Sequence, residues 1–471
     1  MAKSATGAWH AGALQRGLRH ARSSDLPDFP RVARAARRRA LYFSPRVKFS
    51  AGVIIAFLWA ALSYHLAGRW IADLSKVVGS GVADFAILSI AIVPGFMNAF
   101  LVCGLLFDRR PRRRRIEVYP SVSILIAAYN EQDSIVSTVE SIARQHYPGD
   151  LEVIVVDDGS TDNTVRELQH LTYPWLRVLD LKRNGGKAKA LNKALGLVRH
   201  RLTITLDADS YLYRGALANL IGRLMSDPPD TAAVAGAVLV RNSRLNVITK
   251  VQEWDYFHGI AAVKRLQSLF HGTLVAQGAF SVYRTAILHE VGGWPDCVGE
   301  DIVLTWGMLR RGYRVGFAED AVAFTNVPTT LRQLIRQRQR WSRGLIEAFR
   351  VHWPLLFHLR MTTLFIWWNV TFPVLDLGYT LVFLPGILLA LCGVYWIAGP
   401  ITLLVLPLGM LVNLAMFRVQ SVMFVAQGLK VRRNPSGFLT YALLYSLIMQ
   451  PACVIGYFKE LLGMRKNWGT K

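Results

Sequence analysis

Residues 202–209, with the sequence LTITLDAD, begin as a run of leucine and β-branched residues and end in two carboxylates. A continuous apolar run of this length is typical of a strand that is buried on both faces of a sheet. Similar runs occur at 122–128, 153–156, 177–179 and 232–238, with helix-length segments between them. The pattern predicts an α/β domain with a parallel, doubly wound sheet, in which ligands bind beyond the carboxyl ends of the strands.

The composition indicates that part of the chain lies in lipid. Of the 471 residues, 52% are hydrophobic, and the mean hydropathy is +0.28, which is too apolar for a soluble enzyme of this length. The apolar residues gather at the two ends of the chain. The predicted parts are a basic, disordered arm (1–48), two transmembrane helices (49–107), the α/β domain (116–330), amphipathic interface helices (331–360), a C-terminal transmembrane region of three or four spans (361–458) and a basic tail (459–471).

The net charge of +24 is concentrated beside the apolar spans, in the N-terminal arm and in a cluster at 109–115. Such juxtamembrane charge predicts anionic lipids as partners of the arm. The sequence contains no zinc-finger spacing and no RNA-recognition motif, so we do not expect a nucleic-acid partner. The positive-inside rule puts the arm, the cluster and therefore the α/β domain in the cytosol of a multi-pass protein of the inner or plasma membrane. None of the four cysteines has disulfide or zinc-ligand spacing, as expected for a reducing compartment.

The C-terminal region leaves a conflict open. Three spans, near 363–391, 397–417 and 437–457, are the simplest division, but an odd number of crossings would put the basic tail outside the cell. Either the tail violates the charge rule or one segment is interfacial or split.

Polar residues follow the predicted strands, where a ligand is expected. Asp207 and Asp209 follow the strand at 202–206, and two carboxylates at this spacing suit Mg²⁺ or Mn²⁺, which would neutralise a departing diphosphate. The stretch 184–187, NGGK, opens a helix and offers backbone N–H groups and the Lys187 ammonium to an anion. Helix capping and a plain glycine turn are the alternative explanations.

Four motifs come in a fixed order: Asp157-Asp158-Gly159, Asp207-x-Asp209, Gly299-Glu300-Asp301 and Gln337-Arg338-Gln339-Arg340-Trp341. With them, residues 120–345 resemble the family 2 processive glycosyltransferases, which include cellulose, chitin, hyaluronan and poly-N-acetylglucosamine synthases. The Gln-x-x-Arg-Trp motif is the most specific of the four. The resemblance implies a GT-A (Rossmann-like) domain inserted between transmembrane helices.

The resemblance also implies roles for individual residues. Asp157 or Asp158 would contact the uracil and ribose of a UDP-sugar, and Asp207 and Asp209 would hold the uridine and the metal. The residues assigned to the nucleotide-sugar site are Ala128, Asn130, Glu131, Asp157, Asp158, Lys187, Asp207, Gln337, Arg338 and Arg340.

On the acceptor side, Asp301 would be the general base that deprotonates the acceptor hydroxyl, with Glu300 beside it raising its pKa by like-charge proximity. Trp341 would stack on the terminal sugar, and Gln277 and Trp294 fall where the family lines its acceptor site. A strand and a core tryptophan explain Gln277 and Trp294 equally well. The motif helix at 331–350 has the apolar spacing of an amphipathic helix at the membrane surface, where Arg and Trp are by default interface anchors.

The expected function is an inverting, processive polymerisation of a β-linked polysaccharide from a UDP-sugar, UDP-N-acetylglucosamine first, with extrusion across the membrane. Hyaluronan, chitin-like and β-glucan products remain alternatives, as does a non-processive transferase acting on a lipid or short acceptor, or a transporter or scaffold with an inactive domain. The growing polysaccharide and an accessory membrane subunit are the other candidate partners. The end of the chain, 466–471, resembles the cytosolic ends of some hyaluronan synthases, which favours an even number of C-terminal crossings.

Overall fold

The computed structural model describes residues 43–108, 113–114, 116–429 and 433–464. Most of the predicted arm and tail and most of the arginine cluster lie outside these residues. An eight-stranded sheet in the order β3-β2-β1-β4-β7-β6-β8-β5 forms the centre of the α/β domain. Its strands are β1 (Val122–Ala128), β2 (Leu151–Asp157), β3 (Leu176–Asp180), β4 (Leu202–Leu206), β5 (Tyr211–Leu212), β6 (Thr231–Val240), β7 (Phe280–Arg284) and β8 (Arg314–Thr325).

The sheet is mixed rather than wholly parallel. β3, β2, β1 and β4 run parallel to one another, as predicted, and β6 is parallel to β8. β7 runs antiparallel to both β4 and β6, and β5 runs antiparallel to β8. The strands at the five predicted runs, β1 to β4 and β6, therefore all point the same way, as expected, and the strands that run against them, β5 and β7, are ones that the sequence analysis did not predict.

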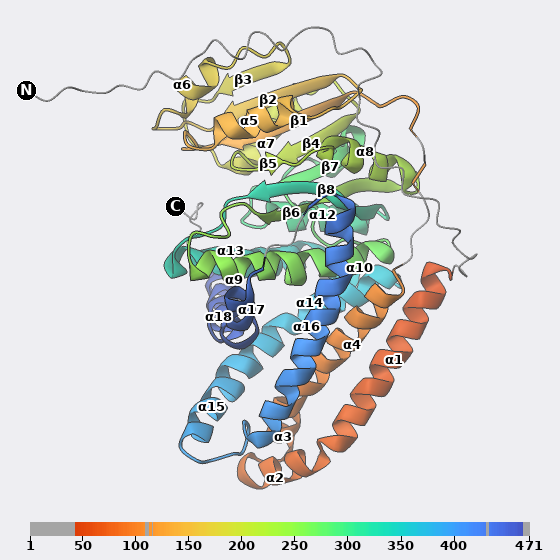
Figure 1. Ribbon diagram of the computed structural model, residues 1–471, viewed down its shortest axis with the longest axis vertical. Helices are drawn as coiled ribbons and strands as arrows, with labels where there is room; N and C mark the ends of the chain where they lie inside the picture. The colour runs from red at the N-terminus through yellow and green to blue at the C-terminus, as the bar shows by residue number, and fades with distance from the viewer. Residues whose placement is uncertain (1–42, 109–112, 115, 430–432, 465–471) are drawn as a thin grey trace, which may run out of the picture. The chain divides into compact units, whose positions relative to one another are not determined.

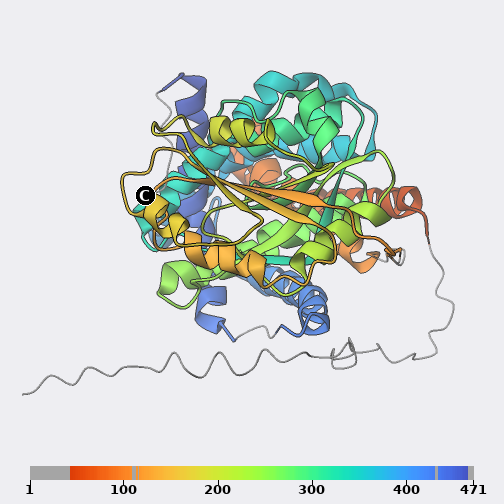
Figure 2. The ribbon, with the colours of Figure 1, turned by 90° about the horizontal axis from the view of Figure 1, so that it is seen from above.

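Helices cover both faces of the sheet (Figures 1 and 2). On one face α5 and α8 pack against alternate residues of β1 and β4, and on the other α7, α11 and α12 pack against residues that include Leu125 and Ile154. The helices of the domain are α5 (Ile135–Ala143), α6 (Thr164–Gln169), α7 (Lys187–Leu195), α8 (Ala216–Ser226), α9 (Val247–Trp254), the π-helical segment η2 (Asp255–Ala262), α10 (Val263–Leu269), α11 (Thr285–Val291), α12 (Glu300–Arg310) and α13 (Leu331–His352).

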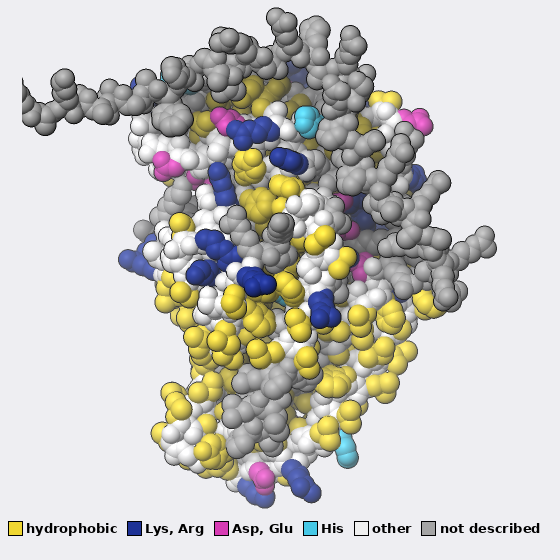
Figure 3. Space-filling view, in the orientation of Figure 1, with side chains coloured by type: hydrophobic (Ala, Val, Ile, Leu, Met, Phe, Trp, Pro, Cys, Tyr) yellow, Lys and Arg dark blue, Asp and Glu magenta, His cyan; other side chains and the backbone are white. Residues whose placement is uncertain are grey.

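Mostly apolar helical segments, several of them continuous with one another, flank the domain. They are α1 (Pro45–Leu66), α2 (Gly68–Val78), α3 (Ser80–Ile87), η1 (Leu88–Ile92) and α4 (Val93–Leu106) before it, and the 3₁₀ turn η3 (Trp353–Phe357), α14 (Met361–Gly378), η4 (Tyr379–Phe383), α15 (Leu384–Leu391), α16 (Pro400–Ala426), α17 (Pro435–Thr440), η5 (Tyr441–Tyr445) and α18 (Ser446–Leu461) after it. Among the described residues, four helices are long and apolar enough to cross a membrane: Pro45–Leu66, Ser80–Leu106, Met361–Leu391 and Pro435–Leu461. Hydrophobic side chains cover much of the visible surface of this helical region (Figure 3).

The core of the α/β domain continues into these helices. Phe100 of α4 lies 5.8 Å from Phe270 and 6.0 Å from Phe365 of α14, measured between ring centroids. Gly104 of α4 leaves the space that the Leu266 side chain of α10 fills. The helical region is therefore packed against the domain and not merely tethered to it.

The last apolar helix, α17 to α18, has both of its ends on the α/β domain. At its start, the Asn434 side chain donates to the Lys250 carbonyl at 2.9 Å and to the Glu253 carboxylate at 2.7 Å, next to α9. At its other end Glu460 accepts from Arg343 of α13 at 2.9 Å. Because both of its ends contact the domain, the helix, whose 27 residues extend about 40 Å, runs along the domain between these two anchors.

The packing of η2 against α16 leads to a prediction about stability. His258 stacks on Trp254 and lies 6.5 Å from the Phe417 ring of α16, and neither of its ring nitrogens has a hydrogen-bond partner among the described residues. Burial lowers the pKa of His258 to about 4. Between pH 6.5 and 4, His258 is therefore protonated in the unfolded chain but neutral in the folded chain. The free energy of unfolding falls as the pH falls through this range.

We expect His258→Phe to remove this sensitivity, which amounts to about 2 kcal/mol between pH 7 and pH 5. Thermal unfolding in detergent, followed by tryptophan fluorescence at the two pH values, measures it. His146→Gln, at an exposed histidine, is the control and should keep the wild-type difference. An equal loss of melting temperature in wild type and His258→Phe would contradict the prediction.

Candidate active site

The loops after β1 and β2 are tied together by side chains that the sequence assigned to the nucleotide. Both oxygens of the Asp158 carboxylate accept backbone N–H groups, from Gly185 at 2.9 Å and Gly186 at 2.7 Å, so Asp158 fixes the glycine turn before α7. Asp157 is fully buried and accepts the N–H groups of Gly159 and Ser160. The two carboxylates thus build the loop walls, and their predicted contact with uracil and ribose stays a prediction.

Asn130 and Glu131 belong to the same loop system. Asn130 has a positive φ of 56°, and its side-chain oxygen accepts the N–H of Thr161 at 2.8 Å. Glu131 accepts the hydroxyl of Ser134 at 2.6 Å. Ala128 is buried at the end of β1, and its carbonyl accepts the N–H of Asp158. A ligand would therefore meet a preformed rim at this edge of the sheet.

Lys187 occupies the centre of the candidate site. Its ammonium forms an ion pair with Asp207 at the end of β4, and a second one at 3.8 Å with Glu300 at the start of α12. Burial alone would lower the pKa of Lys187, but the carboxylates of Asp207 and Glu300 outweigh it and raise the pKa. Gly278 lets its loop pass directly over this ammonium, since a Cβ there would lie 2.8 Å from Nζ.

Negative charge accumulates on the other side of Asp207. Asp209 accepts the Thr325 hydroxyl at 3.0 Å, and burial, followed by the charges of Asp207 and Glu131, raises the pKa of Asp209 to about 7. A divalent cation would relieve this repulsion, so the residues present fit one. No group of three or more His, Cys, Asp and Glu side chains in the described part of the chain could hold a metal. Asp207 and Asp209 would thus share a cation with water or substrate oxygens.

Glu300 and Asp301 form the first turn of α12. Glu300 is buried, and burial raises its pKa to about 7, with Lys187 acting against the shift and Asp301 adding to it. Asp301 is half-buried, and one of its oxygens accepts the N–H of Ile302 at 2.8 Å. The structure therefore shows a raised pKa for Glu300, and the role of Asp301 as the general base stays a prediction.

On α13 the motif residues divide between two directions. Arg340 interacts electrostatically with Glu300, and Gln337 is buried with its side-chain oxygen unpartnered among the described residues. Arg338 instead forms an ion pair with Asp255 of η2 and covers the Trp341 ring at 4.2 Å. Successive helix residues are about 100° apart, so Arg338 cannot share the direction of both Gln337 and Arg340.

The two proposed acceptor residues outside the motif lie deeper. Gln277 donates to the Gly236 carbonyl at 2.6 Å, and its side-chain oxygen is buried without a described partner. Trp294 is 2% exposed and packs edge-on against Tyr283 in the core, so its ring offers no free face for stacking. The core alternative holds for Trp294. Trp341, at 38% exposure, does have a ring surface open to a ligand.

Sequence reasoning missed Asp255 and Tyr256. Asp255 holds Arg338, and the Tyr256 ring lies 6.4 Å from the ring of Trp341. In the structure both residues lie on a π-helical segment, a feature that is common at functional sites, but the sequence around them, which also contains Lys250 and Glu253, gives no such signal. No motif marks either residue.

Comparisons with known proteins agree with this geometry. Residues 123–292 match the family described as Glycosyl transferase family 2. Over 276 residues, or 56% of the chain, the sequence is 29% identical to a poly-beta-1,6-N-acetyl-D-glucosamine synthase of Staphylococcus epidermidis, and over 268 residues it is 30% identical to the same enzyme of Staphylococcus aureus. These alignments span 66% and 63% of the relatives' lengths, which is less than two thirds.

A solved structure shares the fold. It is a mannosyltransferase from Pyrobaculum calidifontis in complex with GDP-Man and Mn²⁺, which matches 89% of this chain and all of its own with a TM-score of 0.52 and 19% identity. The α/β domain of the chain therefore has the GT-A fold, residues 123–292 of it match glycosyl transferase family 2, and its sequence is similar to poly-beta-1,6-N-acetyl-D-glucosamine synthases.

Proposed function

We propose that this chain polymerises a β-linked polysaccharide from a UDP-sugar, UDP-N-acetylglucosamine first, and extrudes the product across the membrane. The observation that carries the proposal is the position of Lys187 between Asp207 and Glu300, since it joins the donor end of the sheet to the first turn of α12, where Asp301 lies. The sequence similarity to poly-beta-1,6-N-acetyl-D-glucosamine synthases supports the choice of sugar.

The reaction would be a single displacement. The Asp301 carboxylate takes the proton of the acceptor hydroxyl, the acceptor oxygen forms a bond to C1 of the donor sugar, and the bond from C1 to the diphosphate oxygen breaks with its electron pair leaving on UDP. Lys187 and Arg340 bring positive charge to the side where the diphosphate would lie. When bound at Asp207 and Asp209, Mg²⁺ or Mn²⁺ would offset the charge of the diphosphate.

We also propose that the domain faces the cytosol and that α17 to α18 lies at the membrane surface. Both ends of this helix contact the domain, whereas the ends of a crossing helix lie on opposite sides of a bilayer. The crossing helices would then be α1, α3 to α4, α14 to α15, and α16. An even number of crossings returns the basic tail to the cytosol, which resolves the conflict in the charge rule.

Incubation of the detergent-solubilised protein with a panel of UDP-sugars and Mg²⁺ or Mn²⁺ tests the function. We expect UDP release with UDP-N-acetylglucosamine and a long product that a β-linkage-specific hydrolase digests. Asp301→Asn should abolish release, because the base is lost, while UDP binding by calorimetry stays within about twofold of wild type. Asp133→Asn, on the exposed surface, is the matched control. A product of one added sugar would instead identify the non-processive transferase.

Substitutions of Arg338 and Arg340, both on α13, should differ in their effects. Arg340→Gln should raise the Kd for UDP roughly tenfold, because a charge-assisted phosphate contact is lost. Arg338→Gln should leave that Kd unchanged and lower the melting temperature, since it leaves Asp255 buried without its partner at a cost of about 3 kcal/mol. Removing both charges, in Arg338→Met with Asp255→Leu, should restore part of the loss. A weakened UDP affinity in Arg338→Gln would contradict this separation and support the contact between Arg338 and the diphosphate that the sequence predicted.

The acidic cluster should bind a cation in a pH-dependent way. Because the pKa of Asp209 is raised, its contribution to stability without metal is present at low pH and is lost as the pH rises through about 7. MnCl₂ should therefore raise the melting temperature more at pH 8 than at pH 6, and Asp209→Asn should abolish most of that rise. Asp133→Asn should keep it. The same rise in Asp209→Asn as in wild type would place the cation elsewhere.

A further inference from the structure

Glu347 of α13 reaches the loop that carries the candidate base. Its carboxylate is 5% exposed and accepts the backbone N–H of Gly299 at 2.9 Å. Gly299 is the residue directly before Glu300 and Asp301, and α12 begins at Glu300. A buried carboxylate thus holds the N-terminus of the helix whose first turn contains Asp301, where negative charge is also favoured by the helix dipole.

Two glycines bring the same helices into backbone contact. A Cβ at Gly299 would lie 2.5 Å from the Cα of Gly344, and a Cβ at Gly344 would lie 2.7 Å from the Cα of Gly299. No side chain fits at either position, so the backbones of α13 and of the Gly299 loop set the spacing directly. Gly344 lies one helical turn after Trp341. The contact therefore fixes the first turn of α12 relative to the Gln337–Trp341 motif.

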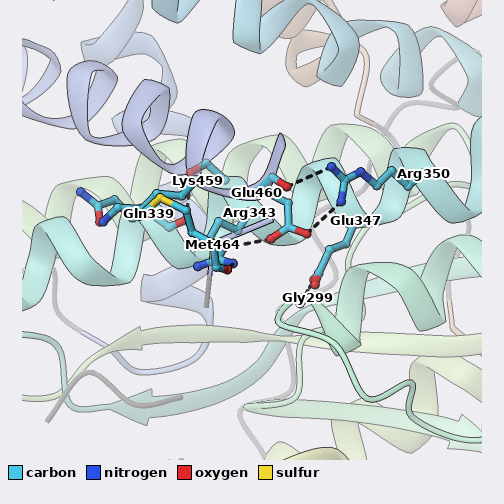
Figure 4. A network of polar contacts seen from close by, with 9 residues as sticks. Gly299, Gln339, Arg343, Glu347, Arg350, Lys459, Glu460 and Met464 are labelled. Atoms are coloured by element: carbon cyan, nitrogen blue, oxygen red, sulfur yellow. Dashed lines mark hydrogen bonds and ion pairs between the residues drawn. The ribbon is translucent and has the colours of Figure 1, made fainter. Parts of the chain in front are cut away.

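The face of α13 that carries Glu347 is also held by the end of α18. Glu460 is 2% exposed and pairs with Arg343 at 2.9 Å and with Arg350 at 3.2 Å, while Arg350 also donates to the Glu460 carbonyl at 2.9 Å (Figure 4). Arg343 further donates to the Met464 carbonyl at 2.7 Å. One carboxylate of α18 therefore holds two arginines that lie on α13 on either side of Glu347.

We propose that Glu347 is a positioning residue for Asp301 and that Glu460, by fixing α13, couples the last helix to the candidate base. The coupling runs from Glu460 through Arg343 and Arg350 to α13, and from α13 through Glu347 and Gly344 to Gly299. It deepens the proposed function, on which its effect on transfer rests. The interfacial helix α18 thereby sets the alignment of Asp301 with an acceptor at Trp341.

Hydrogen exchange of the peptide covering residues 297–303 tests the coupling without any catalysis. We expect Glu347→Ala and Glu460→Gln each to speed exchange there roughly tenfold, because the Gly299 N–H loses its acceptor or the helix carrying that acceptor shifts. Glu347→Gln keeps an oxygen for Gly299 and should retain most of the protection. Glu140→Gln, which removes an exposed carboxylate of α5, is the control. Unchanged exchange in Glu347→Ala overturns the positioning role, and unchanged exchange in Glu460→Gln overturns the coupling.

Kinetics test the consequence for transfer. Glu347→Ala and Glu460→Gln should lower kcat about tenfold with the KM for the UDP-sugar unchanged, since a misplaced base slows the transfer and leaves donor binding alone. Arg350→Gln, at a half-exposed arginine, is a milder variant in case the buried changes prevent folding, and it should lower kcat to a smaller extent. A rise in KM at unchanged kcat overturns the proposal. If wild type releases UDP from no UDP-sugar, the proposed function fails, and the exchange data still decide the coupling.

Discussion

The Lys187 ammonium is the interaction on which the rest of the candidate site depends. It joins Asp207, at the end of a central strand, to Glu300, at the start of a helix that comes much later in the chain. Without it, the carboxylates of Asp207 and Glu300 would face each other in a partly buried space, and such like charges repel strongly there. Asp158 fixes the glycine loop directly before α7, and Lys187 is the first residue of that helix. The Asp158 contacts therefore help to set the position of Lys187.

The sequence predicted the elements with continuous apolar runs best. β1 and β4 have the predicted bounds, because each is buried on both faces and ends where polar residues begin. β7 and β8 were missed as elements, since β8 mixes Glu319 and Asp320 into its run and pairs through an irregularity near Gly236. Their direction depends on how the chain returns to the sheet, and no local pattern contains that information.

Within the site, the types of residue were easier to predict than the directions in which their side chains point. The motif Gln-x-x-Arg-Trp brings Arg340 near Glu300, but the same helix turns Arg338 toward Asp255, a residue outside every motif. Hydropathy leaves the orientation of α17 to α18 open in the same way, because a helix lying along a membrane surface and one crossing it can have the same composition. Our proposal for this helix rests on the partners of the polar residues at its two ends, Asn434 and Glu460, which the sequence does not reveal.

These contacts together explain why α13 has to be held so firmly. Asp207, Asp209 and Glu131 already place excess negative charge at the donor end, and a diphosphate would add more. Positive charge from Lys187, Arg340 and a cation would then have to lie close to the diphosphate, because the attraction between opposite charges falls as their distance grows. Arg340 belongs to α13, and α13 is fixed by contacts with Glu460 of α18 and with Gly299. In the proposed mechanism, the helix that would bring positive charge to the donor is therefore also the helix that would set the position of Asp301, so the alignment of donor and acceptor would depend on one rigid element.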